Sequence, residues 1–311
     1  MVQAFRSLVG VAVTAAALAL SGPMAAQMQT NLSEFKAGKP PSFTEPSAAL
    51  DQFRDVLKAN DVDGLAQLLG LDAAKLRASN EAMLSLALIR DGASRQLRLQ
   101  DVQEFKVVAV GEVLWPLPFP LSRQEDGRWA FDTEIGLEEI VNRRIGENEL
   151  AAIRTVQEYV EAQFEYALVD EDNDRVHEFA QRLISTPGRH DGLYWEPRED
   201  EEESPAGPMI ETAAFSKAKR GDGYYGYRYR ILTGQGPNVL GGEHSYVING
   251  NMTNGFALVA WPVRYRVTGV QTFVVDHSGI VYERDLGDST EKRASAIRLF
   301  NPDDRWDITQ D

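Results

Sequence analysis

The stretch that decides the fold is Tyr224-Tyr225-Gly226-Tyr227-Arg228-Tyr229-Arg230-Ile231-Leu232-Thr233, which is rich in aromatic and β-branched residues. Two later runs, residues 255–262 and 271–280, have the same composition. Glycine, asparagine and proline separate the runs, as they separate neighbouring strands. The pattern predicts an antiparallel β-meander over residues 224–286.

Two details of this stretch predict local structure. The sequence Asp276-His277-Ser278-Gly279 offers an aspartate to start a tight turn and a glycine where positive φ is needed. Residues two apart on a strand share a face, so Tyr225, Tyr227 and Tyr229 are predicted to form one aromatic stripe. The stripe either packs in the core under a helix or forms an exposed platform for a ligand or partner.

A long helix is predicted over residues 134–169, ahead of the meander in the sequence. Ile153, Val156 and Tyr159 recur at helical spacing, which indicates that this helix packs on the sheet. Gly146 predicts a break in the helix, and we place a domain junction near residue 147. Residues 147–311 then form a domain in which a long helix lies on a small antiparallel sheet.

The residues before this junction predict helices followed by strands. Thr44-Glu45-Pro46 is typical of a helix start with Thr44 as the cap, and Asp61 is predicted to cap a second helix. A third helix is expected at residues 79–90, and strands are expected at residues 105–114, 119–123 and 127–132. Residues 44–146 therefore form a first domain, and the whole chain is expected to be of the α+β class.

Composition limits the possible functions. The chain has 311 residues, of which 43% are hydrophobic and 25% charged, with a formal net charge of -15. Binding to nucleic acid needs clustered lysine and arginine to neutralise phosphates, and this charge argues against it.

The N-terminus predicts export from the cytoplasm. Arg6 precedes an apolar run from Leu8 to Leu20, and Ala25-Ala26 follows, so residues 1–26 are predicted to be a signal peptide. Residues 27–43 are polar and are expected to be a disordered leader. We therefore expect a periplasmic or secreted protein with no membrane span in the mature chain. It contains no cysteine and so uses no disulfides.

One acidic stretch, residues 170–178, suggests a metal site. Oxygen ligands at alternate positions suit a hard divalent cation such as calcium. Against this reading, Arg175 stands where a calcium loop has glycine, and Gln181 where it has glutamate. The alternative is a solvated acidic turn, which is also our interpretation of the acidic run at residues 199–203, expected to be a mobile surface loop. The candidate calcium ligands are Asp170, Asp172, Asp174 and Glu178.

No arrangement of residues in the sequence points to a catalytic triad. His244-Ser245 and His277-Ser278 are adjacent pairs, but neither serine lies in a strand-turn-helix elbow. The glycines around Gly234 and Gly241 do not open a helix with lysine, so they indicate turns and not a phosphate loop.

Three resemblances accompany these predictions. Residues 149–166 with the strands up to Tyr282 resemble the globular head of type IV pilins and type II secretion pseudopilins, in which one helix lies across a small sheet. A soluble domain stands here in place of the apolar stalk of that family. Residues 44–135 resemble the cone-shaped domains similar to nuclear transport factor 2. Residues 44–308 resemble domain-of-unknown-function family 2950, exported bacterial proteins, through segments such as Leu117-Pro118-Phe119-Pro120-Leu121 and Asn142-Arg143-Arg144-Ile145-Gly146.

The first function we expect is a non-catalytic binding or scaffolding role in the bacterial envelope, with an envelope protein or glycan as partner. The alternative is an envelope hydrolase that acts on glycan or peptide through carboxylates and His244 or His277.

Overall fold

The computed structural model describes residues 32–171, 174–197 and 203–310. The predicted signal peptide and residues 27–31 of the predicted leader lie outside these residues. Residues 32–43 are not a disordered leader. They begin with the short helix η1 (Leu32–Phe35), which buries its first and last side chains, and Phe43 exchanges two backbone hydrogen bonds of 2.7 Å with Trp129.

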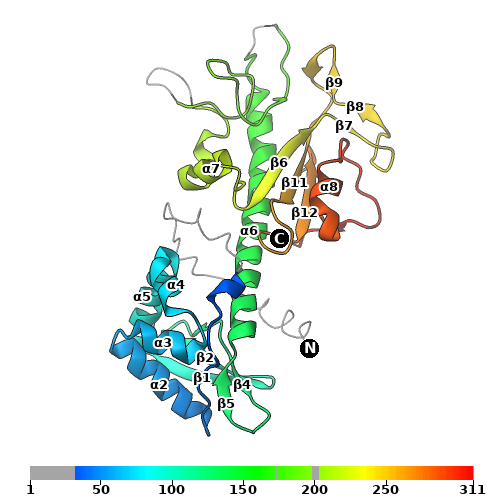
Figure 1. Ribbon diagram of the computed structural model, residues 1–311. Coiled ribbons are helices and arrows are strands. Elements are labelled where there is room, and N and C mark those ends of the chain that lie inside the picture. The colour runs from blue at the N-terminus through cyan, green and yellow to red at the C-terminus, as the bar shows by residue number, and fades with distance from the viewer. Residues whose placement is uncertain (1–31, 172–173, 198–202, 311) are drawn as a thin grey trace.

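Helix α6 (Thr133–Tyr166) runs along the length of the molecule, and one group of helices and strands lies at each of its two ends (Figure 1). Its 34 residues correspond to about 50 Å of helix. Asp132 caps it by accepting a hydrogen bond from the backbone of Ile135 at 3.1 Å. The break predicted at Gly146 is wrong, because the helix continues through this residue. A glycine inside a helix costs only about 1 kcal/mol relative to alanine, and packing at both ends offsets this cost.

Four helices and a small sheet form the N-terminal lobe, which occupies one end of α6. Asp61 accepts a hydrogen bond from the backbone of Gly64 at 2.9 Å, which confirms the predicted cap of the second helix. The first helix is capped at Glu45 and not at Thr44, and Glu45 makes no side-chain bond to the helix. The helices are α2 (Pro46–Lys58), α3 (Val62–Leu69), α4 (Ala73–Ala78) and α5 (Asn80–Arg95).

The sheet of the N-terminal lobe is antiparallel, with strand order β1-β2-β4-β5 and with β3 paired to β2. The strands predicted at residues 119–123 and 127–132 are present as β4 and β5, and they pair with each other, with Leu121 opposite Phe131. The core of this lobe lies between helices and sheet around Phe53, Leu68 and Phe131. The strands are β1 (Leu97–Val102), β2 (Phe105–Val110), β3 (Trp115–Pro116), β4 (Leu121–Arg123) and β5 (Trp129–Phe131).

The predicted meander is confirmed as the main sheet of the C-terminal lobe, which occupies the other end of α6 (Figure 1). Its antiparallel order is β14-β13-β12-β11-β6. The turn at Asp276 is also as predicted, with Gly279 at φ +77° and its amide donating to the Asp276 carbonyl at 3.0 Å. The strands are β6 (Tyr227–Leu232), β11 (Ala257–Pro262), β12 (Gln271–Asp276), β13 (Val281–Asp285) and β14 (Asp307–Ile308).

The two faces of this sheet are covered by different elements. Helix α6 packs on one face, where the hydroxyl of Tyr159 donates to the carbonyl of Ala257 at 3.2 Å. Short helix α8 (Thr290–Ala294), preceded by η3 (Gly287–Ser289), packs on the other, where the indole of Trp261 donates to Glu291 at 2.9 Å. The helix-on-sheet packing predicted for α6 is therefore confirmed.

The predicted tyrosine stripe is only partly present. Tyr227 and Tyr229 lie on β6, on the face that α6 covers, and Tyr227 is fully buried beside Phe273. Tyr225 does not belong to the strand. It lies in a turn with φ +50°, followed by Gly226 at φ +74°, so the strand begins two residues later than the stripe requires.

Two excursions lie outside the main sheet. The first, between α6 and β6, is largely irregular and contains η2 (Gly207–Met209) and α7 (Thr212–Lys219). The second, between β6 and β11, contains two small hairpins made of β7 (Gly234–Gln235) with β8 (His244–Ser245) and β9 (Val247–Ile248) with β10 (Asn251–Met252).

The fold is α+β, as predicted, with one hydrophobic core in each lobe. In the part of the chain that the structure describes, every helix is too short or too polar to cross a membrane.

Candidate functional site

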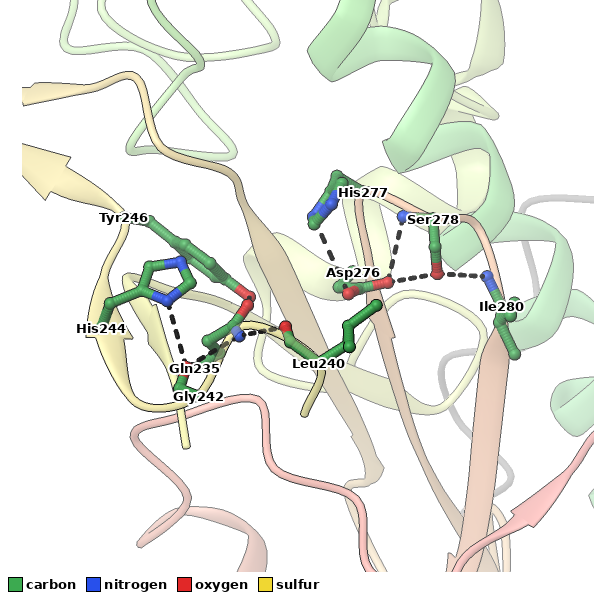
Figure 2. A network of polar contacts seen from close by, with 9 residues as sticks. All are labelled: Gln235, Leu240, Gly242, His244, Tyr246, Asp276, His277, Ser278 and Ile280. Atoms are coloured by element: carbon green, nitrogen blue, oxygen red, sulfur yellow. Dashed lines mark hydrogen bonds and ion pairs between the residues drawn. The ribbon is translucent and has the colours of Figure 1, made fainter. Parts of the chain in front are cut away.

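The candidate site is a group of polar side chains near the end of β12, which we call the Asp276 cluster (Figure 2). Three of its members come from the β7–β8 hairpin and the residue after it, and three from the β12–β13 turn. The fold thus brings together the two histidine-serine regions that the sequence left apart. The members are Gln235, His244, Tyr246, Asp276, His277 and Ser278.

Asp276 is a buried carboxylate with only 5% of its surface exposed. Its Oδ1 accepts hydrogen bonds from the backbone of Ser278 at 3.0 Å and from the Ser278 hydroxyl at 2.5 Å. The Nδ1 of His277 lies 3.7 Å from the other carboxylate oxygen, and about half of the His277 side chain is exposed. The carboxylate therefore shapes the turn and lies beside the imidazole of His277.

Gln235 organises the other half of the cluster. Its Nε2 donates to the carbonyls of Leu240 at 3.0 Å and Gly242 at 2.9 Å, and its Oε1 accepts from the hydroxyl of Tyr246 at 3.2 Å. Gln235 and Tyr246 are both buried. Burial raises the pKa of Tyr246, and the charge of Asp276 raises it further, so this hydroxyl stays protonated and acts as a donor.

The cluster does not have the geometry of a nucleophilic triad. The hydroxyl of Ser278 is bonded to a carboxylate and not to an imidazole. Ser245 donates to the carbonyl of Val247 at 2.9 Å, and the Nδ1 of His244 lies 3.1 Å from the carbonyl of Gly242. The hydrogen bonds of these side chains fix turns and loops, as expected of a structural network.

The other two histidines lie in the excursion after α6. The Nδ1 of His177 is 3.0 Å from the carbonyl of Ala167. His190 stacks on Trp195 with ring centres 4.1 Å apart, and its Nδ1 lies 3.2 Å from a carboxylate oxygen of Glu171. These contacts fasten the excursion near the end of α6.

The predicted calcium ligands accept hydrogen bonds from the protein itself. Asp170 accepts from the backbone of Arg175 at 2.9 Å, and Asp174 accepts from the backbone of Val176 at 2.7 Å. Glu178 accepts from the backbone of Met252 at 2.8 Å, on a different segment.

Five of the acidic residues that the sequence singled out lie outside the residues that the structure describes. They are Asp172 and residues 199–202 of the acidic run. Within the described residues, no group of three acidic or histidine side chains is close enough to hold a metal ion. Calcium binding at Asp170, Asp172, Asp174 and Glu178 stays a prediction.

Sequence analysis missed the buried polar residues that matter most for the C-terminal lobe. Gln163 is fully buried, donates to the Tyr159 hydroxyl at 2.9 Å and to the Ala180 carbonyl at 2.8 Å, and accepts from the Ala180 amide at 2.8 Å. Its position four residues after Tyr159, on the apolar face of α6, is a signal that could have revealed it. Gln235 lies in strand β7 between Gly234 and Gly236, where the sequence predicted a turn, and its neighbours offer no such signal.

A cavity near the first helices is too small for a substrate. It lies where α2, α3 and α5 meet, is lined by Val56, Leu65 and Leu86 among others, and has a volume of about 10 Å³. This is about enough for the centre of one water molecule, whereas ligand sites are usually hundreds of Å³.

Comparison with known proteins gives one match. No curated protein and no solved structure is significantly similar to the chain. A family model described as "Protein of unknown function (DUF2950)" matches residues 41–309. The match covers both lobes and most of the sequence, and the chain therefore belongs to this family.

Proposed function

We propose that this protein is exported to the bacterial envelope, as a periplasmic or secreted protein, and has a non-catalytic binding or scaffolding role there. The observation that carries the proposal is the bonding of the Asp276 cluster. The hydroxyl of Ser278 is bonded to Asp276, and the amide of Gln235 is bonded to two loop carbonyls. Groups that hold loops in place in this way fit a preorganised surface better than a reaction centre.

Export rests on the sequence of residues 1–26 and is tested by fusion. These residues, placed ahead of a reporter enzyme that is active only outside the cytoplasm, are expected to give reporter activity. The matched control replaces Arg6 with glutamate, which removes the positive end of the signal. Activity that is absent, or equal in both fusions, would contradict export.

The binding role is tested with purified mature protein and isolated envelope fractions. The protein is expected to remain with peptidoglycan or with an envelope protein through washing, without releasing soluble glycan or peptide fragments. Fragment release that disappears in His277→Ala would favour the hydrolase instead.

The hydrolase is the second candidate because one observation favours it. A half-exposed imidazole lies 3.7 Å from a buried carboxylate, which is an arrangement that can hold and transfer a proton. His277→Ala and Asp276→Asn are then both expected to abolish fragment release, whereas His244→Ala, which removes a ring bonded to a loop carbonyl, is expected to affect it less.

The likeness of the two lobes to known modules is also part of the proposal. Helix α6 lying across an antiparallel sheet supports a pilin-head-like C-terminal lobe. Short helices ahead of an antiparallel sheet support a cone of the nuclear transport factor 2 type at the N-terminal end. A likeness of fold alone identifies no activity, so the proposed role rests on the Asp276 cluster and not on these likenesses.

A further inference from the structure

Strand β6 forms one edge of the main sheet of the C-terminal lobe. The strand is hydrogen-bonded to β11 on one side, and it stands at the end of the strand order (Figure 1). Its register places Arg228 opposite Trp261 and Arg230 opposite Val259. The other side of β6 faces away from the sheet.

Alternate residues of β6 point their backbone groups away from β11. The amide and the carbonyl of Tyr227 bond to Tyr224, at 3.1 and 2.9 Å, and not to β11. Because bonding direction alternates along an antiparallel strand, the backbone groups of Tyr229 and Ile231 also point outward. The next outward carbonyl, that of Thr233, accepts from Tyr246 at 2.8 Å.

Tyr229 and Ile231 therefore form an open edge between two closed ends. Among the described residues, no hydrogen bond reaches the backbone amide or carbonyl of either residue. The open edge presents two donors and two acceptors in the spacing of a β-strand. Proteins usually cover or charge such an edge, because it is a template for another strand.

We propose that the open edge at Tyr229 and Ile231 binds an extended peptide segment of a partner protein, which adds to the sheet as a further strand beside β6. The proposal deepens the binding role proposed above and rests on it. Strand addition uses backbone hydrogen bonds for affinity and alternate side chains for specificity.

The charges beside the open edge favour basic side chains on the α6 face. Glu158 of α6 and Glu211 ahead of α7 interact electrostatically with the phenols of Tyr224 and Tyr225, and the Glu211 amide donates to the Tyr224 hydroxyl at 3.1 Å. Burial raises the pKa of Glu158, and the positive charge of Arg154 on the same helix offsets part of this rise. The two carboxylates still outnumber this one cation beside the edge.

On the opposite face of the edge, the basic residues of β6 already have partners. Arg228 pairs with Glu291 at 2.7 Å, and Arg230 donates to the Ser295 carbonyl at 2.9 Å and lies over the ring of Trp261. A bound strand should therefore carry basic residues at alternate positions and uncharged residues between them. A second copy of the chain fits less well, because both copies would carry a net charge of -15.

The first test uses a fluorescent peptide of eight residues that alternates lysine and threonine. We expect saturable binding to the mature protein by fluorescence polarisation. A matched peptide whose alternate amides are N-methylated keeps its charge but loses half of its donors, and it should bind at least tenfold more weakly. Equal binding of the two peptides, or binding of neither, would overturn the proposal.

The second test locates the site by amide exchange measured with NMR. In the free protein the amides of Tyr229 and Ile231 should exchange faster than those of Arg228 and Arg230, and the peptide should slow them at least tenfold. Unchanged exchange at Tyr229 and Ile231 would overturn the proposal.

A charge variant with a matched control completes the experiment. Glu158→Gln should weaken the binding of the lysine peptide several-fold. Glu161→Gln, a change at an exposed position of the same helix, should leave this binding unchanged. Equal effects would contradict the assignment of the basic positions. If the peptide does not bind at the open edge but the protein still binds envelope material, strand addition is refuted and the proposed binding role remains.

Discussion

The two lobes have the same class of fold but are stabilised in different ways. The N-terminal core is built from apolar stripes on short helices, and its largest buried side chains are hydrocarbon, such as Phe53 and Leu68. More polar side chains are buried in the C-terminal lobe, among them Gln163, Gln235 and Asp276, than at the N-terminal end, where Thr133 and Glu139 are examples. The stability of the N-terminal lobe therefore depends mainly on the volume and helical spacing of apolar side chains. The stability of the C-terminal lobe depends more on single buried groups whose hydrogen bonds fix its loops.

The largest expected effect is in the N-terminal core. Phe53→Ala removes a buried ring whose centre lies 5.9 Å from the centre of the Phe131 ring. The change should lower the free energy of unfolding by about 4 kcal/mol. Hydrogen exchange with mass spectrometry should show faster exchange in α2 and β5 and little change in β11 and β12. Leu84→Ala, at an exposed position of α5, is the control. Equal loosening of both lobes would show that the two cores are not distinct.

The next effect is in the C-terminal core. Gln163→Ala leaves the amide and carbonyl of Ala180 without their bonds and should lower the free energy of unfolding by about 3 kcal/mol. Denaturant melts would measure it, with Gln157→Ala as the control, because that glutamine is exposed on the same helix. A change below the control's would mean that buried polar groups do not stabilise this lobe.

A smaller effect is expected where α6 meets the start of β12. The Oε1 of Glu149 accepts hydrogen bonds from the backbone amides of Val270 at 2.7 Å and Gln271 at 3.0 Å. Glu149→Ala should cost about 2 kcal/mol, and Glu149→Gln should cost less because an acceptor oxygen remains. Thermal melts of the two variants provide the measurement. If glutamine is as damaging as alanine, the hydrogen bonds do not carry the effect.

The smallest effect concerns the charge of Glu158. Burial raises the pKa of this carboxyl, so its ionised form is disfavoured in the folded state. The free energy of unfolding of the wild-type protein should therefore fall as the pH rises, beginning at the ordinary glutamate pKa and ending above the raised pKa of Glu158. Glu158→Gln should melt slightly higher than wild type at pH 7 and at the same temperature below the ordinary pKa. A gain that persists in acid would contradict this cause.

Much of the fold could be predicted because local chemistry determines it. The cap at Asp61, the turn at Asp276 and the apolar stripe around Tyr159 each follow from residues close together in the sequence, and all are present. The strand β1 and the helix α4 were missed, because short elements carry too few residues to show a period.

Most of the errors come from contacts between distant residues, and one comes from a local turn. Helix α6 passes through Gly146 because both of its ends are packed, which outweighs the local preference of one glycine. Tyr225 leaves the strand because Tyr224 and Tyr227 bond to each other across a tight turn. In the candidate site, the meeting of the β7–β8 hairpin with the β12–β13 turn depends on the long excursion before β11, which no local pattern specifies.

The central claim is that one uninterrupted helix connects the two cores. Because the chain has no cysteine, Glu138→Cys and Glu161→Cys together give a unique pair of spin-label sites on exposed positions of α6, at either side of Gly146. Double electron-electron resonance should give one narrow distance distribution centred near 35 Å, the length of about 23 helical residues. A broad distribution, or one centred at a clearly shorter distance, would mean that the helix bends or breaks between the lobes and would contradict the account.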